Sequence, residues 1–325
     1  MNEFETIARL FLPLTRGEPG ALGLGDDAAI LEPRPGFDLV LTKDAIVAGV
    51  HFFPDDPPDA IGAKLMRVNL SDLAAKGAAP RAFLLAAAFP PDAPAGWAEA
   101  FAAGIGADLE TYGGALIGGD TVSTRGPAFF SLTAIGEVPS GTMIRRRGAR
   151  AGDLVCVSGT IGDAALHVAH RLAGKAVTGG DHLAARYLWP QPRLALGLAL
   201  RGLARAGCDI SDGLVADLGH ICEQSGLGAV IEAARVPLSA AAAASVAADG
   251  SLLETVLTGG DDYELVFALP PDADLAALQA IAPVTVIGRF EVGQGVRVMD
   301  RSGSPMALAR GGWQHPVGRN EAGSP

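Results

Sequence analysis

The spacing of apolar residues in the first part of the chain predicts alternating helices and strands. Phe4, Ile7, Ala8 and Phe11 recur at helical spacing, which predicts an amphipathic first helix that Pro13 ends. The pattern that follows predicts four strands: Phe37 to Thr42 with Asp44 at its end, Ala82 to Phe89, Ala115 to Gly118 with Asp120 at its end, and Phe129 to Val138. It also predicts two helices. One is opened by Pro57 and Pro58 and closed by Gly77, and the other runs from Trp97 to Tyr112 and is stopped by Gly113.

The second part of the chain shows a similar mixture of patterns. It predicts strands at Leu154 to Ser158, Ala229 to Glu232, Glu264 to Leu269, Val284 to Phe290 and Val296 to Asp300, with helices at Ala164 to Leu172, Arg193 to Arg205, Leu214 to Gln224 and Ala240 to Ala248. Strands and helices mix without strict alternation, so both parts are expected to be α+β.

The chain length and one turn-rich stretch predict two domains. At 325 residues the chain can bury two cores, and the stretch from Pro139 to Asp153 contains many turn residues. We therefore expect an N-terminal domain over 1–138, a C-terminal domain over 139–313, and a disordered tail over 314–325, where the sequence is polar and rich in proline and glycine.

Composition excludes several classes of protein. The chain is 49% apolar and 19% charged, which is typical of a globular protein, and its net charge of −11 argues against nucleic acid or an anionic membrane as a partner. The longest apolar stretch, Ala82 to Pro91, is too short to cross a bilayer, and the first residues lack the basic segment of a signal peptide. Three cysteines leave an odd number for disulfides, so we expect a reducing, cytoplasmic setting and core positions for the cysteines.

Aspartate recurs in short islands framed by glycine and apolar residues. The islands are Leu24-Gly25-Asp26-Asp27, Thr42-Lys43-Asp44, Asn69-Leu70-Ser71-Asp72, Gly118-Gly119-Asp120-Thr121, Asp209-Ile210-Ser211-Asp212-Gly213 and Gly259-Gly260-Asp261-Asp262-Tyr263-Glu264. Two carboxylates about 4 Å apart repel by roughly 4 kcal/mol at an effective dielectric near 20, and bound cations would remove that penalty. All-oxygen ligands select hard ions such as Mg²⁺, which bridge to substrate phosphates. The pattern therefore predicts a Mg²⁺ and phosphate site.

Each island also has a simpler interpretation. Gly-Asp and Ser-Asp pairs are ordinary turn residues, and Asp212 with Gly213 would cap the helix that follows. Arg146 could bind a nucleotide phosphate or belong to a solvated basic loop, and His51 could touch substrate or be a half-buried structural histidine. Trp313 could stack on a flat ring or anchor the end of the chain. Repetition of aspartate, where turns would scatter Asn, Ser and Pro, favours the functional interpretation.

Taken in order, these islands resemble the thiamine-monophosphate kinase family. The resemblance rests on Gly23-Leu24-Gly25-Asp26-Asp27-Ala28-Ala29, Val47-Ala48-Gly49-Val50-His51-Phe52, the run Val68 to Ala78, Leu116-Ile117-Gly118-Gly119-Asp120-Thr121, Asp209 to Leu214 with Asp217-Leu218-Gly219-His220, and Gly259 to Leu265. It extends from about residue 3 to about residue 313. Gly-Gly-Asp alone is shared across the wider aminoimidazole-ribonucleotide-synthetase-like superfamily, whereas the combination with His51 and Asp-Tyr-Glu-Leu is specific to the kinase.

The resemblance implies a fold and an activity. It implies a two-domain aminoimidazole-ribonucleotide-synthetase-like fold, with an N-terminal mixed sheet that pairs across a homodimer in a barrel-like interface and a C-terminal α/β sandwich. It also implies transfer of the γ-phosphoryl group of ATP to thiamine monophosphate, with several Mg²⁺ ions. By position, the resemblance implies that Mg²⁺ would be held by Asp27, Thr42, Lys43, Asp44, Asp72, Asp120, Asp209 and Asp212. ATP would be contacted by Tyr112, Gly119, Asp120, Arg146 and Ser211. Thiamine monophosphate would be contacted by His51, Asp261 and Trp313.

Two positions depart from the family pattern. Lys43 stands where the family commonly has Thr, and a charged lysine side chain cannot ligate Mg²⁺, so this position could offer only its backbone carbonyl, or its ammonium to a phosphate. Asp261 stands where Glu is common, one methylene shorter, so its substrate contact could run through water. Asp26, Asp217 and Asp262 are expected to be framework residues.

The implied chemistry agrees with the residues present. Phosphoryl transfer depends on positioning and charge neutralisation, and an acceptor phosphate with a second pKa of about 6 needs no general base at neutral pH. We therefore expect direct in-line transfer and no catalytic base. Two alternatives stay open: another ATP-dependent synthetase of the superfamily, and a protein that binds nucleotide or metal without catalysis.

Overall fold

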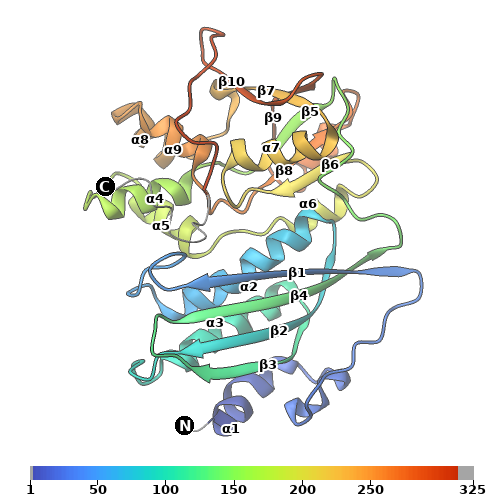
Figure 1. Cartoon of the computed structure of the whole chain (residues 1–325), viewed down its shortest axis with the longest axis vertical. Helices are drawn as coiled ribbons and strands as arrows, with labels where there is room; N and C mark the ends of the chain where they lie inside the picture. The colour runs from blue at the N-terminus through green and yellow to red at the C-terminus, as the bar shows by residue number, and fades with distance from the viewer. Residues whose placement is uncertain (1–2, 314–325) are drawn as a thin grey trace, which may run out of the picture.

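Two β-sheets, one in each half of the chain, organise the protein (Figure 1). The computed structural model describes residues 3–313. The first sheet has the order β1-β4-β2-β3 and consists of β1 (Phe37–Val47), β2 (Ala79–Phe89), β3 (Ala115–Ser123) and β4 (Phe129–Pro139). The second has the order β10-β7-β9-β5-β8-β6 and consists of β5 (Leu154–Ser158), β6 (Ala206–Asp209), β7 (Gly228–Glu232), β8 (Leu265–Leu269), β9 (Val284–Glu291) and β10 (Gly295–Met299).

Both sheets are mixed. In the first, β4 pairs antiparallel with β1 and with β2, whereas β2 and β3 are parallel. In the second, β10 and β7 are parallel and the other pairs are antiparallel. The mixture of helices and strands confirms the α+β prediction.

Helices cover one face of the first sheet. The long helices α2 (Pro58–Ala75) and α3 (Trp97–Tyr112) lie behind it in Figure 1. Four shorter segments precede the sheet: α1 (Glu3–Thr6), the π-helix η1 (Ile7–Phe11) and the 3₁₀ helices η2 (Leu12–Thr15) and η3 (Pro19–Leu24). Pro58 opens α2, where a missing N–H breaks no hydrogen bond.

Strand β1 presents two different faces. Val40 and Ile46 belong to the core under α2, so Thr42 and Asp44, at alternate positions between them, also point toward α2. The opposite face of the sheet carries a smaller cluster that contains Ala82, Ile117 and Ile135 and is covered by Ala21 of η3.

The second sheet is accompanied by the remaining helices. They are α4 (Asp163–Leu172), α5 (Gly180–Leu188), α6 (Leu194–Ala199), α7 (Leu214–Ser225), the 3₁₀ helix η4 (Ala233–Arg235), α8 (Ala240–Ala248), α9 (Leu252–Thr258) and α10 (Leu275–Gln279).

Helix α2 joins the two halves. It packs on β1 and α3 on one side and on α6, β6 and β8 on the other. One core therefore holds Leu70 and Leu73 of α2 together with Leu194 of α6 and Phe267 of β8. The position of α2 is therefore determined by its packing against both halves of the chain.

Several predicted boundaries were wrong. The first helical region continues past Pro13 to Thr15 as a 3₁₀ turn, because proline is tolerated in the first turn of a helix. Strands β1 and β3 run on to Val47 and Ser123, so Asp44 and Asp120 lie inside strands and not at their ends. The helix predicted from Arg193 to Arg205 is only α6, since the chain then turns and forms β6 against β8.

Three short helices, α5, α9 and α10, were not predicted. The tail from Gln314 onward lies outside the described residues, and the domain boundary near Pro139 stays a prediction. Among residues 3–313, no helix combines the length and the apolar character that crossing a membrane requires.

The contact between α2 and α3 depends on two glycines. A Cβ at Gly62 would lie 2.1 Å from Phe101 O, and a Cβ at Gly104 would lie 2.0 Å from Asp59 O. The two helix backbones therefore approach too closely for any side chain at these points.

We expect Gly62→Ala to destabilise the protein by about 1–3 kcal/mol, although alanine favours helix, because the helices must separate. Urea denaturation measures this change. Gly219→Ala in α7 is the matched control: no heavy atom lies within 4 Å of a Cβ there, so it should stabilise the protein by about 0.5–1 kcal/mol. Equal effects of the two substitutions would contradict the close-packing explanation.

Candidate active site

Four aspartates from different elements converge beside α2. Asp44 comes from β1, Asp72 from the last turns of α2, Asp209 from the end of β6, and Asp212 from the loop that follows. Burial, reinforced by Asp72 and Asp212, raises the pKa of Asp44 to about 7. Burial, with Asp72 and Asp217 nearby, also raises the pKa of Asp209 well above its usual range. These four aspartates are called the junction cluster below.

The Asn69-Leu70-Ser71-Asp72 segment of α2 holds the junction cluster in place. Asn69 Oδ1 accepts a hydrogen bond of 3.0 Å from the backbone N–H of Asp44. Ser71 Oγ donates to Asp209 Oδ2 over 2.9 Å, and Thr42 Oγ1 donates to Asp72 Oδ2. Side chains on one helix thus connect a strand of the first sheet with a strand of the second.

Asp217 holds the loop that carries Ser211 and Asp212. Its Oδ2 accepts the backbone N–H groups of Ser211, Asp212 and Gly213 at 3.0, 3.0 and 3.1 Å. Burial and the neighbouring Asp212 raise the pKa of Asp217 to about 7. The interpretation of Asp212 as a helix cap was wrong: Gly213 is the N-cap of α7 and makes no side-chain cap, while Asp217 accepts these N–H groups instead.

Asp212, Asp217 and His220 also have ligand atoms within 4.8 Å of one another. One oxygen of Asp217 is committed to three backbone N–H groups, and Oδ1 is buried without a hydrogen-bond partner. The loop geometry therefore makes Asp217 chiefly a framework residue.

Two cations adjoin the junction cluster. Lys76 Nζ donates to Gly207 O over 3.0 Å, and burial lowers its pKa despite the nearby Asp209 and Asp72. Arg146 is exposed and lies close enough to act on Asp217 and Lys76. Lys76 was not predicted as a site residue, although it follows the apolar last turn of α2.

The Gly259–Glu264 loop packs on the Ser211 loop. Asp261 N–H donates to Ser211 O over 2.9 Å, and Tyr263 N–H donates to Ile210 O over 2.8 Å. Asp261 and Tyr263 both have positive φ, 72° and 51°, a conformation that residues other than glycine rarely adopt. Such backbone strain is common at functional sites.

Glu264 anchors this loop. It is fully buried and accepts hydrogen bonds from Arg186 at 2.7 Å and from Arg193 at 2.6 and 2.7 Å. Ser158 Oγ also donates to it over 2.5 Å. Two guanidinium groups around one carboxylate keep the loop close to β5 and α5.

The residues predicted to contact thiamine monophosphate lie around this loop. His51 Nδ1 accepts the backbone N–H of Val47 over 3.2 Å, and Lys64 lies between His51 and Asp261. Trp313 N–H donates to Asp212 O over 2.9 Å, which brings the end of the described chain beside the junction cluster. Lys64 was not predicted as a site residue, although its position three residues after Ile61 places it on the buried face of α2.

Asp27, Gly119 and Asp120 lie elsewhere, on the opposite face of the first sheet. They line a cavity of about 460 Å³ with Leu84 and Ile117. In the strand register, Asp44 is three strands from Gly119, so these residues are separated by roughly 14 Å. A single copy of the chain does not bring this second group, called the open-face group below, to the junction cluster.

Lys43 and Tyr112 lie outside the junction cluster. The Lys43 side chain alternates with Asp44 and lies on the open face, where Nζ is 3.5 Å from Thr133 Oγ1. Tyr112 ends α3 beside Arg67, whose guanidinium lies 5.8 Å from the ring centre, and burial raises the tyrosine's pKa. The roles of both residues stay predictions.

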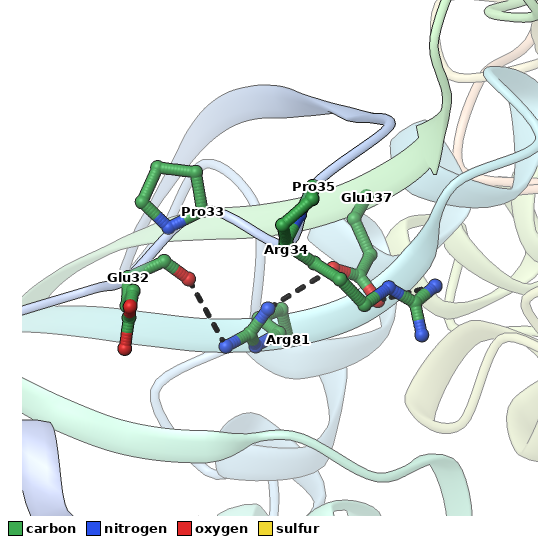
Figure 2. Close-up of a pocket in the computed structure, with 6 residues that line it drawn as sticks. All are labelled: Glu32, Pro33, Arg34, Pro35, Arg81 and Glu137. Atoms are coloured by element: carbon green, nitrogen blue, oxygen red, sulfur yellow. Dashed lines mark hydrogen bonds and ion pairs between the residues drawn. The ribbon is translucent and has the colours of Figure 1, made fainter.

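A second hollow, of about 420 Å³, lies at the other end of the sheet (Figure 2). Arg34 and Arg81 each pair with Glu137 at 3.0 Å, and Arg81 also reaches Glu32 O at 3.3 Å. Glu137 is five residues along β4 from Leu132, the partner of Asp44, or roughly 17 Å. The two arginines of this hollow are therefore paired with one carboxylate and are remote from the junction cluster.

The family models of the AIR synthase related proteins match both halves of the chain. The N-terminal domain model matches residues 25–138 and the C-terminal domain model matches residues 150–301. The thiamine-monophosphate kinase of Caulobacter vibrioides is 44% identical over 321 residues, covering 97% of this chain and 91% of that protein. The Salmonella typhimurium enzyme of the same name is 40% identical and covers 97% and 98%.

Solved structures agree with these matches. Thiamine-monophosphate kinase from Stenotrophomonas maltophilia superposes with a TM-score of 0.80 at 41% identity, covering 89% of this chain and 96% of that one. AaThiL complexed with AMPPCP and TMP superposes with a TM-score of 0.78 at 32% identity, covering 92% and 97%. Hydrogenase maturation protein HypE in complex with ATP, at 21% identity and a TM-score of 0.80, shows a shared fold alone.

The two sheets and the aspartates between them define a protein of the AIR synthase related class. Within this class, the chain belongs to the thiamine-monophosphate kinase family. The family resemblance and the fold class expected from the sequence are both confirmed.

The raised pKa of Asp44 predicts a pH dependence of the metal-free protein. The pKa of Asp44 is about 7 in the folded protein and near 3.8 in the unfolded chain. The folded state is therefore stabilised by the proton on Asp44. This contribution to the free energy of unfolding is complete below pH 3.8 and is lost as the pH rises through 7. Asp44→Asn should therefore gain on the order of 1 kcal/mol of stability over wild type between pH 5 and pH 8 in EDTA. Urea midpoints measure this gain.

Asp92→Asn, at an exposed position, is the control and should show no such gain. The same difference between Asp44→Asn and wild type at both pH values would contradict the electrostatic origin of the effect.

Proposed function

We propose that this chain transfers the γ-phosphoryl group of ATP to thiamine monophosphate, giving ADP and thiamine diphosphate. The observation that carries the proposal is the junction cluster, in which burial and the neighbouring Asp72 raise the pKa of Asp44 and of Asp209, and no side-chain cation pairs directly with either of them among the described ion pairs. Membership of the thiamine-monophosphate kinase family, and the AaThiL complex with AMPPCP and TMP, support the same reaction.

The donor set of the junction cluster fits Mg²⁺. Thr42, Asp44, Asp72, Asp209 and Asp212 offer only oxygen atoms, which hard divalent cations prefer. We propose that they hold several Mg²⁺ ions together with Asp27 and Asp120, and that Lys43 contributes its backbone carbonyl. When bound, Mg²⁺ would neutralise the phosphate charges of the two substrates.

The residues of the chain bind and orient the substrates. We propose that Tyr112, Gly119, Asp120, Arg146 and Ser211 contact ATP, and that His51, Asp261 and Trp313 contact thiamine monophosphate. The acceptor phosphate is largely dianionic at neutral pH, so no side chain has to remove a proton. We therefore propose direct in-line transfer.

We further propose a homodimer that completes the site. Strands β1 and β3 are the two edges of the first sheet, and free sheet edges favour pairing with another copy. Leu41 on β1 and Val122 on β3 are exposed, 63% and 50%, and would be covered by such pairing. A β3 edge set against the β1 edge of a second copy would bring the open-face group of one chain next to the strand that carries Asp44 in the other.

The proposed reaction is expected in the cytoplasm. All three cysteines are free and buried, as a reducing compartment allows.

Incubation with ATP, Mg²⁺ and thiamine monophosphate should yield ADP and thiamine diphosphate in equal amounts. Asp72→Asn should lower kcat by roughly 100-fold or more, because Asp72 contacts Thr42 and adjoins Asp44 and Asp209. Asp272→Asn, at an exposed position, is the control and should keep wild-type activity.

Near-normal turnover of Asp72→Asn at saturating Mg²⁺ would refute the metal assignment. ADP formation without thiamine diphosphate would refute the proposed acceptor. Retention of configuration at a chiral γ-phosphorus would exclude direct transfer.

A mixing experiment tests the dimer. Asp120→Asn and Asp209→Asn should each be inactive alone, because each lacks one half of the site. After refolding together, half of the dimers are mixed, and each mixed dimer has one intact site, so about a quarter of wild-type activity should return. No recovery, with mixed dimers demonstrated by differently sized tags, would show that both groups act within one chain.

A further inference from the structure

A buried lysine lies between the two residues that we assign to thiamine monophosphate. Lys64 belongs to α2, and its side chain is only 2% exposed. Lysine is almost never fully buried unless its charge is paired, since an isolated ammonium is costly to remove from water. The partners of Lys64 therefore indicate its role.

The ammonium of Lys64 has three partners. Its Nζ donates to Asp261 Oδ2 over 2.8 Å and to His51 O over 3.0 Å. It also lies 3.7 Å from the centre of the Tyr187 ring, a cation–π contact. An ammonium has three N–H donors, so these partners leave none for a substrate phosphate.

The three partners belong to three separate segments. His51 is in the loop that follows β1, Asp261 is in the loop that precedes β8, and Tyr187 is in α5. Tyr187 reinforces the arrangement, because its hydroxyl lies 3.4 Å from His51 O and donates to Asp56 Oδ2 over 3.2 Å. Lys64 is thus the point at which the first half of the chain is joined to the acceptor side of the second.

Asp261 keeps acceptor capacity despite these contacts. Its Oδ2 receives Lys64 and its Oδ1 receives the Tyr263 hydroxyl over 3.0 Å. A carboxylate offers about four lone-pair sites, so each oxygen can accept a further hydrogen bond. The Asp261 side chain is 24% exposed, so a ligand can reach it.

Further carboxylates lie near Asp261. Tyr263 has Asp261, Asp44 and Asp209 as electrostatic neighbours, which places the Asp261 loop beside the junction cluster. An unpaired Asp261 would add another negative charge next to a dianionic acceptor. Lys64 compensates this charge without contacting the phosphate.

We propose that Lys64 is a positioning residue for the phosphoryl acceptor. It holds the Asp261 carboxylate and the His51 segment at a fixed separation, and it cancels the charge of Asp261, so that thiamine monophosphate meets hydrogen-bond acceptors and not an unpaired anion. This inference rests on the proposed function through the assignment of His51 and Asp261 to the acceptor.

Steady-state kinetics with each substrate varied in turn test the proposal. Lys64→Met keeps the length of the side chain and removes its charge. Its KM for thiamine monophosphate should rise by about tenfold or more, as expected for loss of charge-assisted hydrogen bonds, while its KM for ATP should change less than about twofold. Lys175→Met, at an exposed position, is the matched control and should leave both constants unchanged.

A double-mutant cycle with Asp261→Asn separates positioning from simple loss of stability. If Lys64 acts through Asp261, the double variant should bind thiamine monophosphate no more weakly than Lys64→Met alone. Lys64→Gln, which keeps two N–H donors, should raise KM by only about threefold and serves if Lys64→Met does not fold. Calorimetric titration of thiamine monophosphate gives the same comparison without turnover.

The outcomes distinguish this inference from the proposed function. A wild-type protein that neither binds nor phosphorylates thiamine monophosphate refutes the function and with it this inference. If the wild type is active, three results would overturn the role of Lys64 alone. They are an unchanged KM for thiamine monophosphate in the Lys64 variants, an equal rise in both KM values, and additive effects of Lys64→Met and Asp261→Asn.

Discussion

The crowding of carboxylates in a largely water-free region is the constraint around which the two halves of the protein are arranged. Asp44, Asp72 and Asp209 reach one region from two sheets and a helix, and burial together with the neighbouring Asp72 raises the pKa of both Asp44 and Asp209. A pair about 4 Å apart at an effective dielectric near 20 repels by roughly 4 kcal/mol. Packing elsewhere has to offset this repulsion whenever cations are absent. The core shared by α2, α6 and β8 provides that packing, so the stability of the fold and the position of these carboxylates depend on the same helix.

Helix α2 also determines the spacing within the site. Lys64, at one end of the site, contacts the acceptor-side loops, while Ser71 and Asp72, two turns later, contact the junction cluster. Eight residues of helix correspond to roughly 12 Å. One rigid element therefore sets the separation between the loops that carry His51 and Asp261 and the junction cluster. Gly62 and Gly104 keep this helix tight against α3, which fixes its position relative to the first sheet.

Local patterns predicted most long elements, because α2, α3 and the strands of the first sheet have clear apolar spacing and proline or glycine at their ends. β6 could not be predicted in this way. It has four residues, one of them glycine, and exists because β8 pairs with it. The pairing of β1 with β4 likewise extends β1 through Asp44.

The site could be predicted by residue type but not by grouping. Alternation along β1 indicates that Thr42 and Asp44 share a face and that Lys43 has the other, but which face α2 covers depends on tertiary packing. Strand order then separates Gly119 from Asp44 by the width of the sheet, and sequence does not encode that order locally. Lys64 could not be predicted as a site residue, because a single lysine in an apolar helix forms no motif and its hydrogen-bond partners are far away in the chain.

The left-handed backbone at Asp261 and Tyr263 restricts which residues these two positions can accept. Each such residue costs on the order of 1 kcal/mol or more, and the anchoring of Glu264 by two arginines sustains that cost. Among residues with side chains, Asp tolerates this conformation better than longer ones, because its short polar group can bond locally. Position 261 thus has a conformational reason to be Asp, independent of what it binds. Glycine would relieve the strain at either position, so this loop keeps two strained side chains at a cost in stability that glycine would avoid.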